Sequence, residues 1–160
     1  MSIQVGDKLP SGTLRRLGKG GIDAISTDEL FGGKKVVLFA VPGAFTPTCN
    51  DTHFPGFMVL EDKIRAKGAD AIVCMAVNDP FVMAAWAKSL NAAGAIDVVA
   101  DGNGDYSAAL GLTLDLAAIG LGTRSKRFAL IAENGVVKYL GVEPGKEVGV
   151  SSAEAVLENL

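Results

Sequence analysis

Residues 35–50 read Lys35-Val-Val-Leu-Phe-Ala-Val-Pro-Gly-Ala-Phe-Thr-Pro-Thr-Cys-Asn50, and this segment is the most informative about the fold. Its first seven residues are a short apolar run bounded by glycine and proline, which predicts a buried strand. Helical spacing of apolar residues follows from about residue 47 to residue 67, with Thr46 as candidate N-cap and Pro47 as candidate first helical residue. Pro55 should kink this helix. A strand that turns at once into a helix is therefore predicted, with Cys49 in the first helical turn.

The rest of the chain continues to alternate between strand and helix patterns. Further strands are predicted at residues 69–77, 96–100, 127–132 and 136–140, the last two joined by the turn Glu133-Asn-Gly135. Further helices are predicted at residues 105–110 and 152–160. Another helix should begin at Pro80 after the cap Asn78-Asp79, with an inner face of Phe81, Val82, Ala85, Trp86 and Leu90.

This order predicts one α/β domain over residues 1–160, with a mixed central sheet and helices on both faces. Thioredoxin-like folds share this layout with other α/β sandwiches.

Charge and hydropathy exclude several classes of protein. The net charge is −3 and the basic clusters are short, which argues against a nucleic-acid partner. No apolar run reaches the roughly 18 residues that a membrane span requires. The first residues lack the basic start and apolar run of a secretory signal. We therefore expect a cytoplasmic protein with no membrane partner.

The two cysteines, Cys49 and Cys74, define the possible chemistry. The chain has no Cys-x-x-Cys and one histidine, so a structural metal site is not supported. Cys74 falls inside an apolar predicted strand, where an inert core thiol is the favoured interpretation. Cys49 is placed where free N–H groups and the helix dipole favour a thiolate, which is the nucleophilic form of the thiol. Placement alone fits a small core residue at Cys49 equally well.

The residues around Cys49 resemble a known family. The pattern Pro42-x-x-x-Thr46-x-x-Cys49 is similar to the active-site motif of the peroxiredoxins. The resemblance is to the atypical type II subfamily in particular, and it covers nearly the whole chain. The segments that carry it are Pro42–Cys49, Thr52-His-Phe-Pro-Gly-Phe57, Val77-Asn-Asp-Pro-Phe-Val82, Trp86, Arg124-Ser-Lys-Arg-Phe128 and Val142-Glu-Pro144.

The resemblance implies a thioredoxin-like fold and a role for each matching residue. Cys49 would be the peroxidatic cysteine, and the Thr46 hydroxyl would contact both thiolate and peroxide. Pro42 would shield the site. Arg127 would stabilise the thiolate and polarise the peroxide, because a fixed guanidinium favours negative charge on sulfur and on the leaving oxygen. Arg124 is the rival for that role.

Two further positions bear on the chemistry. His53 lies four residues after Cys49 on the same helical face and could act as a base or a cationic neighbour, although a hydrogen-bonded structural histidine is the favoured interpretation. The subfamily often carries a resolving cysteine near the C-terminus. The matching stretch here, Gly149-Val-Ser-Ser152, has none, so no disulfide within one chain is expected.

We therefore expect a peroxidase that reduces hydrogen peroxide and alkyl hydroperoxides through a Cys49 sulfenic acid, with no metal, haem, flavin or other cofactor. The resemblance implies recycling by glutathione, often with glutaredoxin, or alternatively by thioredoxin, and a homodimer. Two other functions remain open at this stage. One is a thioredoxin-type thiol–disulfide oxidoreductase, and the other is a redox-sensing or holdase protein on the same fold.

Overall fold

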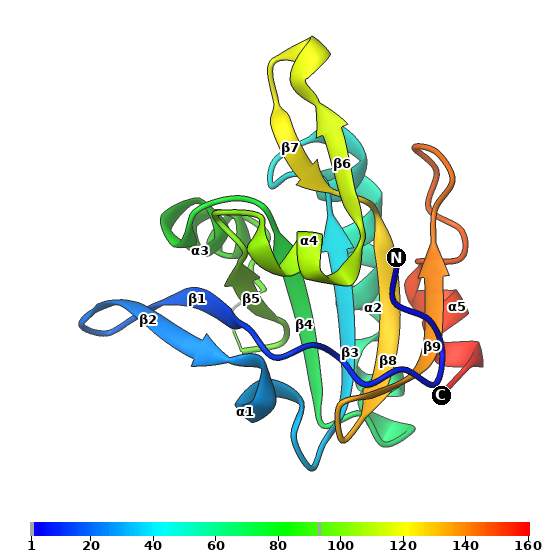
Figure 1. Cartoon of the computed structure of the whole chain (residues 1–160). Helices are drawn as coiled ribbons and strands as arrows, with labels where there is room; N and C mark the ends of the chain where they lie inside the picture. The colour runs from blue at the N-terminus through cyan, green and yellow to red at the C-terminus, as the bar shows by residue number, and fades with distance from the viewer. Residues whose placement is uncertain (1, 93) are drawn as a thin grey trace.

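A computed structural model describes residues 2–92 and 94–160. The main sheet of this part of the chain has the strand order β2-β1-β5-β4-β3-β8-β9 (Figure 1). Its strands are β1 (Thr13–Gly18), β2 (Gly21–Ser26), β3 (Lys35–Val41), β4 (Ala71–Ala76), β5 (Asp97–Ala100), β8 (Phe128–Glu133) and β9 (Val136–Val142). Strands β3, β4 and β5 are parallel, whereas β8 runs antiparallel to β3. The sheet is mixed, as predicted.

Strand β3 lies inside this sheet, between β4 and β8, and its residues from Val36 to Val41 are all buried. Side chains of a strand alternate between the two faces of a sheet. Phe39 and its odd-numbered neighbours pack in one core cluster, and Leu38 and its even-numbered neighbours pack in a second. Burial on both faces explains why the segment is continuously apolar.

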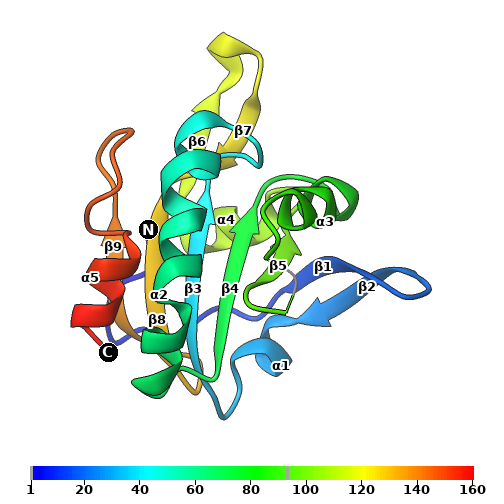
Figure 2. The same ribbon diagram turned by 180° about the vertical axis from the view of Figure 1, so that it is seen from behind.

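Helices cover both faces, which confirms the predicted layering. The first core cluster holds buried residues of α2 (Phe54–Ala66), α3 (Pro80–Ser89) and α5 (Ala153–Glu158), and Figure 2 shows α2 and α5 lying across that face. The second cluster holds residues of α1 (Thr27–Phe31) and α4 (Asp105–Leu110), on the face turned forward in Figure 1. Among the described residues, no helix has the length and apolar character needed to cross a membrane.

The distortion predicted at Pro55 is found one turn earlier. Residues Cys49–His53 form a π-helical turn, closed by a hydrogen bond from the Phe54 N–H to the Cys49 carbonyl. Pro55 lies in the first turn of α2 directly after it. Proline has no N–H to donate and its ring crowds the carbonyl four residues earlier, so the regular α-helical bonding cannot continue through this point.

Some predictions about the fold were wrong or incomplete. On α3, Phe81 is 58% exposed and Ala85 is also exposed, whereas the buried residues are Pro80, Met83, Trp86 and Ala87. The hairpin of β1 and β2, helix α1, and the small sheet of β6 (Thr113–Leu116) and β7 (Gly122–Ser125) were not predicted. In β1 and β2 only Leu14 is buried, so the apolar alternation that signals a strand is missing. Figure 1 shows β6 and β7 projecting beyond the end of the main sheet.

Candidate active site

Cys49 lies in the first turn of the helix, which follows β3 after the loop of residues 42–46. The Thr46 carbonyl accepts a hydrogen bond from the Asn50 N–H at 2.9 Å, which places the helix start at the predicted N-cap. Pro47 and Thr48 are helical, and Cys49 opens the π turn. The Cys49 side chain is only 1% exposed. The thiol therefore occupies a buried position near the free N–H groups of a helix start.

Thr46 and Pro42 belong to the loop that precedes this helix. The Thr46 hydroxyl donates a hydrogen bond to the Gly43 carbonyl at 2.6 Å. The hydroxyl thus stabilises the loop, while the Thr46 carbonyl accepts the first hydrogen bond of the helix. A Cβ atom at Gly43 would lie 2.9 Å from Arg124 Nη1 and 3.2 Å from Thr46 Cγ2, so a side chain at this position would displace the Arg124 guanidinium. Pro42 is half-buried beside it. The loop is tightly folded around the start of the helix.

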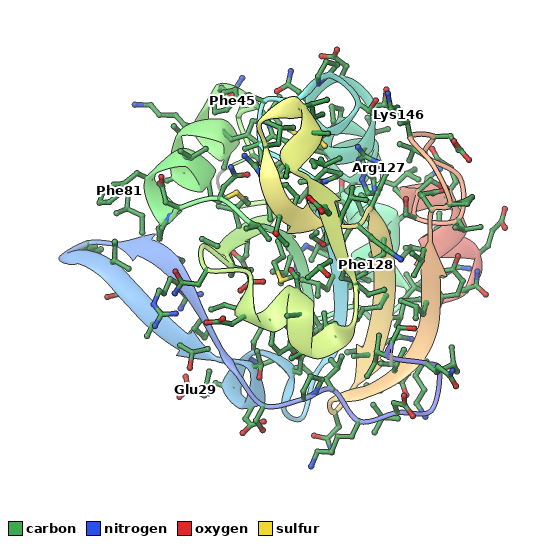
Figure 3. All side chains as sticks on the ribbon, turned by 45° about the horizontal axis from the view of Figure 1, so that its top comes forward. Glu29, Phe45, Phe81, Arg127, Phe128 and Lys146 are labelled. Atoms are coloured by element: carbon green, nitrogen blue, oxygen red, sulfur yellow. The ribbon has the colours of Figure 1, made fainter. Side chains whose placement is uncertain are left out.

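The Arg127 guanidinium contacts the Cys49 sulfur directly. Arg127 comes immediately before β8, next to Phe128 (Figure 3), and it is only 6% exposed. Its Nη2 donates a hydrogen bond to Cys49 Sγ at 3.1 Å, and its Nη1 lies 2.8 Å from Nδ1 of His53. A cation held this close to sulfur favours the thiolate by charge and by hydrogen bonding. The arrangement also leaves a positive charge where an oxygen anion would form during attack on a peroxide.

Arg124, the rival cation, has a different task in this structure. Its Nε donates to the Leu121 carbonyl at 2.9 Å, and its Nη1 donates to the Pro42 carbonyl at 3.3 Å. Arg124 lies in β7, so the bond to the Pro42 carbonyl connects the β6–β7 hairpin to the loop before Cys49. The cation at the thiol is thus Arg127, the residue that the sequence ranked first.

His53 is a neutral, hydrogen-bonded histidine. Its Nε2 lies 2.8 Å from the Ser151 carbonyl, and because Arg127 is a donor, Nδ1 must accept and Nε2 must carry the proton. Burial lowers the pKa of His53 from 6.5 to about 4; the Ser151 carbonyl raises it, and Arg127 lowers it further. This geometry agrees with the favoured structural interpretation. A cationic role at neutral pH is wrong, because His53 is then uncharged.

Cys74 is fully buried in β4, in register with Phe39 of β3. It belongs to the same core cluster as Cys49. Burial raises the pKa of the Cys74 thiol well above its usual value; the nearby Cys49 raises it too, while Arg127 acts in the opposite direction. The predicted burial is confirmed, and a thiol in this environment is a poor nucleophile.

Sequence reasoning missed two groups of residues that support the site. The Asn78 side-chain carbonyl accepts from the Ala44 N–H at 2.9 Å, and the Trp86 indole donates to the Asn50 side chain at 2.9 Å. Both fasten the segment around Cys49 to α3 and the turn before it. They lie in blocks that carry the family resemblance, but the sequence gives no partner for either. The second group is Glu143 and Ser151, whose carbonyl lies against His53. Within residues 2–92 and 94–160, no cluster of three or more histidine, cysteine, aspartate or glutamate side chains could hold a metal ion.

The sequence profile of the redoxin family matches residues 4–157 of this chain. Peroxiredoxin-2C of Oryza sativa subsp. japonica is 49% identical over 159 residues, which cover 99% of this chain and 98% of that protein. The chain belongs to the peroxiredoxin family. The chloroplastic peroxiredoxin-2E of Arabidopsis thaliana is 48% identical over 163 residues, covering 99% of this chain and 70% of that protein. Among solved structures, reduced Prx3 from Vibrio vulnificus in complex with hydrogen peroxide shares 51% identity with a TM-score of 0.94, and 98% of each chain is covered.

As a peroxiredoxin, the protein is a thiol-dependent peroxidase with a thioredoxin-like fold, and both predictions are confirmed. The several matches to proteins named peroxiredoxin-2 agree with the resemblance to the type II subfamily. A thiol peroxidase needs one activated cysteine, and of the two thiols only Cys49 has a guanidinium hydrogen-bonded to its sulfur.

Proposed function

We propose that Cys49 is the peroxidatic cysteine of this peroxiredoxin and that Pro42, Thr46 and Arg127 complete its site. The observation that carries this proposal is the 3.1 Å hydrogen bond from Arg127 Nη2 to Cys49 Sγ in a buried environment. The substrates are hydrogen peroxide and alkyl hydroperoxides. The hydrogen peroxide named with the Vibrio vulnificus relative supports the first of them.

In the reaction, the Cys49 thiolate attacks the terminal oxygen of the peroxide. An S–O bond forms, the O–O bond breaks, and the product is Cys49 sulfenic acid together with an alkoxide or hydroxide, which then takes up a proton. Arg127 stabilises the charge that moves from sulfur to the leaving oxygen. The Thr46 hydroxyl already donates to Gly43, so its lone pairs remain to accept a hydrogen bond from the peroxide O–H. Pro42, half-buried in the loop, shields the reacting atoms from water.

Regeneration of Cys49 uses an external thiol in this proposal. Cys74 is buried within the sheet, and Ser151 occupies the stretch where the subfamily often carries its resolving cysteine. Glutathione attacks the sulfenic acid, releases water and leaves a mixed disulfide. A second glutathione or glutaredoxin then displaces Cys49 as a thiol. Thioredoxin is the alternative reductant. Because this cycle needs a reduced thiol pool, we place the protein in the cytoplasm.

We also propose that the peroxiredoxin forms a homodimer through the end of the fold that carries the active site. Three exposed apolar side chains come from segments around this end: Phe45 is 52%, Phe81 58% and Ile119 70% exposed. Figure 3 shows Phe45 and Phe81 pointing outward. Sedimentation of the wild type and of a Phe45→Ser, Phe81→Ser variant tests the proposal. An unchanged sedimentation coefficient would count against this surface.

The test of the chemistry is peroxide turnover with glutathione, with glutathione plus glutaredoxin, and with thioredoxin, measured side by side. Intact mass after one equivalent of peroxide should show the gain of one oxygen on Cys49, which glutathione converts to an adduct. A loss of two hydrogens with Cys49 linked to Cys74 would contradict the one-cysteine cycle. Turnover that only thioredoxin supports would select the alternative reductant.

A further inference from the structure

Glu143 is a buried carboxylate that the peroxidase reaction, as described so far, does not use. It follows β9 directly and is 7% exposed. Its Oε2 accepts hydrogen bonds from the Gly149 N–H at 2.6 Å, the Ser151 N–H at 2.8 Å and the Ser151 hydroxyl at 2.6 Å. Burial raises the pKa of Glu143, but the hydrogen bonds from Ser151 and Gly149 outweigh burial and bring the pKa below its usual value. Glu143 is therefore an anion at neutral pH.

A series of hydrogen bonds connects Ser151, which Glu143 binds, to the reactive sulfur. The Ser151 carbonyl accepts from His53 Nε2, and His53 Nδ1 accepts from Arg127 Nη1. The other terminal nitrogen of Arg127 donates to Cys49 Sγ. The Glu143 N–H also donates to the Arg127 carbonyl at 2.9 Å, so Glu143 constrains the backbone of that arginine as well.

We propose that Glu143 is a positioning residue for the peroxidase: by fixing Ser151 it sets the orientation of His53, which directs the Arg127 guanidinium at Cys49. The proposal rests on the proposed roles of Cys49 and Arg127, and its test keeps the two apart.

The physical reason is that neutral His53 can carry its proton on either of its two ring nitrogens. A neutral imidazole carries its proton on one nitrogen only, and the hydrogen bond made at one nitrogen decides the state of the other. With the Ser151 carbonyl in place, the proton stays on Nε2, and Nδ1 presents a lone pair to Arg127. Without that carbonyl, a proton on Nδ1 would face the guanidinium, and the arginine would have to turn away from the sulfur.

The loop that carries Ser151 needs a fixed point for this to work. Residues 144–147, 149 and 150 of the loop are exposed. An exposed loop with little buried apolar surface is easily displaced. The Glu143 carboxylate binds the N–H groups of both Gly149 and Ser151 and so holds them at the end of β9. These hydrogen bonds keep the Ser151 carbonyl next to His53. A shift of about 1 Å at a positioning group is enough to cost a reaction about 100-fold.

The test compares Glu143→Ala with the matched control Glu147→Ala, which removes an exposed carboxylate from the same loop. The rate constant for peroxide reduction should fall about ten- to a hundredfold in Glu143→Ala and stay at the wild-type value in Glu147→Ala. The rate constant for alkylation of Cys49 by iodoacetamide at neutral pH is the second readout. It should fall in Glu143→Ala, because the Arg127 guanidinium no longer faces the sulfur, whereas a merely structural loosening of the loop would expose the sulfur and raise it.

Two further comparisons locate the effect. In the double variant Glu143→Ala, Arg127→Ala, the rate should equal that of Arg127→Ala alone, because a residue that acts through Arg127 has nothing left to position. His53→Gln, which keeps an acceptor and a donor, should retain more activity than His53→Leu, which keeps only apolar bulk.

Circular dichroism establishes that each variant is folded. Where Glu143→Ala does not fold, Glu143→Gln and Ser151→Ala replace it, each with a fall of about two- to tenfold. Wild-type rates of peroxide reduction and of alkylation in the folded Glu143 and Ser151 variants would overturn the inference, and so would fully additive losses in the double variant. If Arg127→Ala itself has the wild-type rate, the proposed function fails and the inference fails with it.

Discussion

Replacing Arg127 by alanine removes the two hydrogen bonds that connect the cation to the site. One bond, of 3.1 Å, goes to Cys49 Sγ, and the other, of 2.8 Å, goes to His53 Nδ1. The bond to sulfur joins two charged groups once the thiol has ionised, and it acts on the charge that moves to the leaving oxygen. The second bond only orients the guanidinium. The first bond should therefore dominate the effect on rate, and the second should contribute to stability.

The size of the loss follows from the first bond. A hydrogen bond to a charged group contributes about 1.5–3 kcal/mol. A change of about 1.4 kcal/mol in a barrier alters the rate tenfold, so Arg127→Ala should slow peroxide reduction about 10- to 150-fold. Arg127→Lys should recover little of this, because an ammonium group is a point charge and cannot reach Cys49 and His53 together. An unpaired Nδ1 on buried His53 should also cost about 1–3 kcal/mol of the free energy of unfolding.

Stopped-flow fluorescence can follow the reaction, because the single tryptophan, Trp86, is hydrogen-bonded to Asn50, the residue after Cys49. Arg16→Ala, an exposed arginine on the distant β1–β2 hairpin, is the matched control and should react like the wild type. Arg124→Ala releases the β6–β7 hairpin from the Pro42 carbonyl and should have a smaller effect. A larger loss in Arg124→Ala than in Arg127→Ala would refute the assignment of the cation.

Three other variants test the remaining parts of the site. Cys49→Ser should abolish peroxide turnover and keep the circular dichroism spectrum of the wild type; substantial turnover would contradict the assignment of the nucleophile. Cys74→Ser should react with peroxide at nearly the wild-type rate but lose about 1–3 kcal/mol in urea unfolding, because a hydroxyl replaces a thiol inside an apolar sheet. A much slower reaction would show that Cys74 takes part. For His53, the unfolded chain binds a proton near pH 6.5 and the folded chain only near pH 4, so its contribution to stability is present above pH 6.5 and is lost as the pH falls to about 4. Over that range the wild type should lose about 3 kcal/mol relative to His53→Gln in denaturant unfolding, and parallel pH curves would argue against a buried neutral histidine.

The parts of the fold that were predicted correctly are those in which a local pattern records burial. Strands β3 and β4 were found because their residues are apolar on both faces. The β8–β9 hairpin was predicted because an Asn-Gly pair tolerates the positive φ angles that a tight turn requires. Asn134 and Gly135 adopt such angles, 48° and 78°. The β1–β2 hairpin was missed, since it buries only Leu14 and its exposed side chains leave no periodic signal. The inner face of α3 was predicted only in part: Trp86 is buried and Val82 and Leu90 pack against the core, but Phe81 is apolar yet exposed.

Local patterns and motifs were enough to predict the strand-to-helix transition, the position of Cys49 in the first helical turn, the burial of Cys74 and the family. Each of these depends on neighbouring residues or on a motif that can be matched directly. The folded structure was needed to show that Arg127 contacts the thiol while Arg124 bonds to the loop before Cys49, since the two arginines lie three residues apart in the chain with similar local surroundings. It also decided the protonation of His53 and the link to Glu143. Hydrogen bonds act over about 3 Å. His53 and the Ser151 carbonyl are 98 residues apart in the chain, and only folding brings them within that distance.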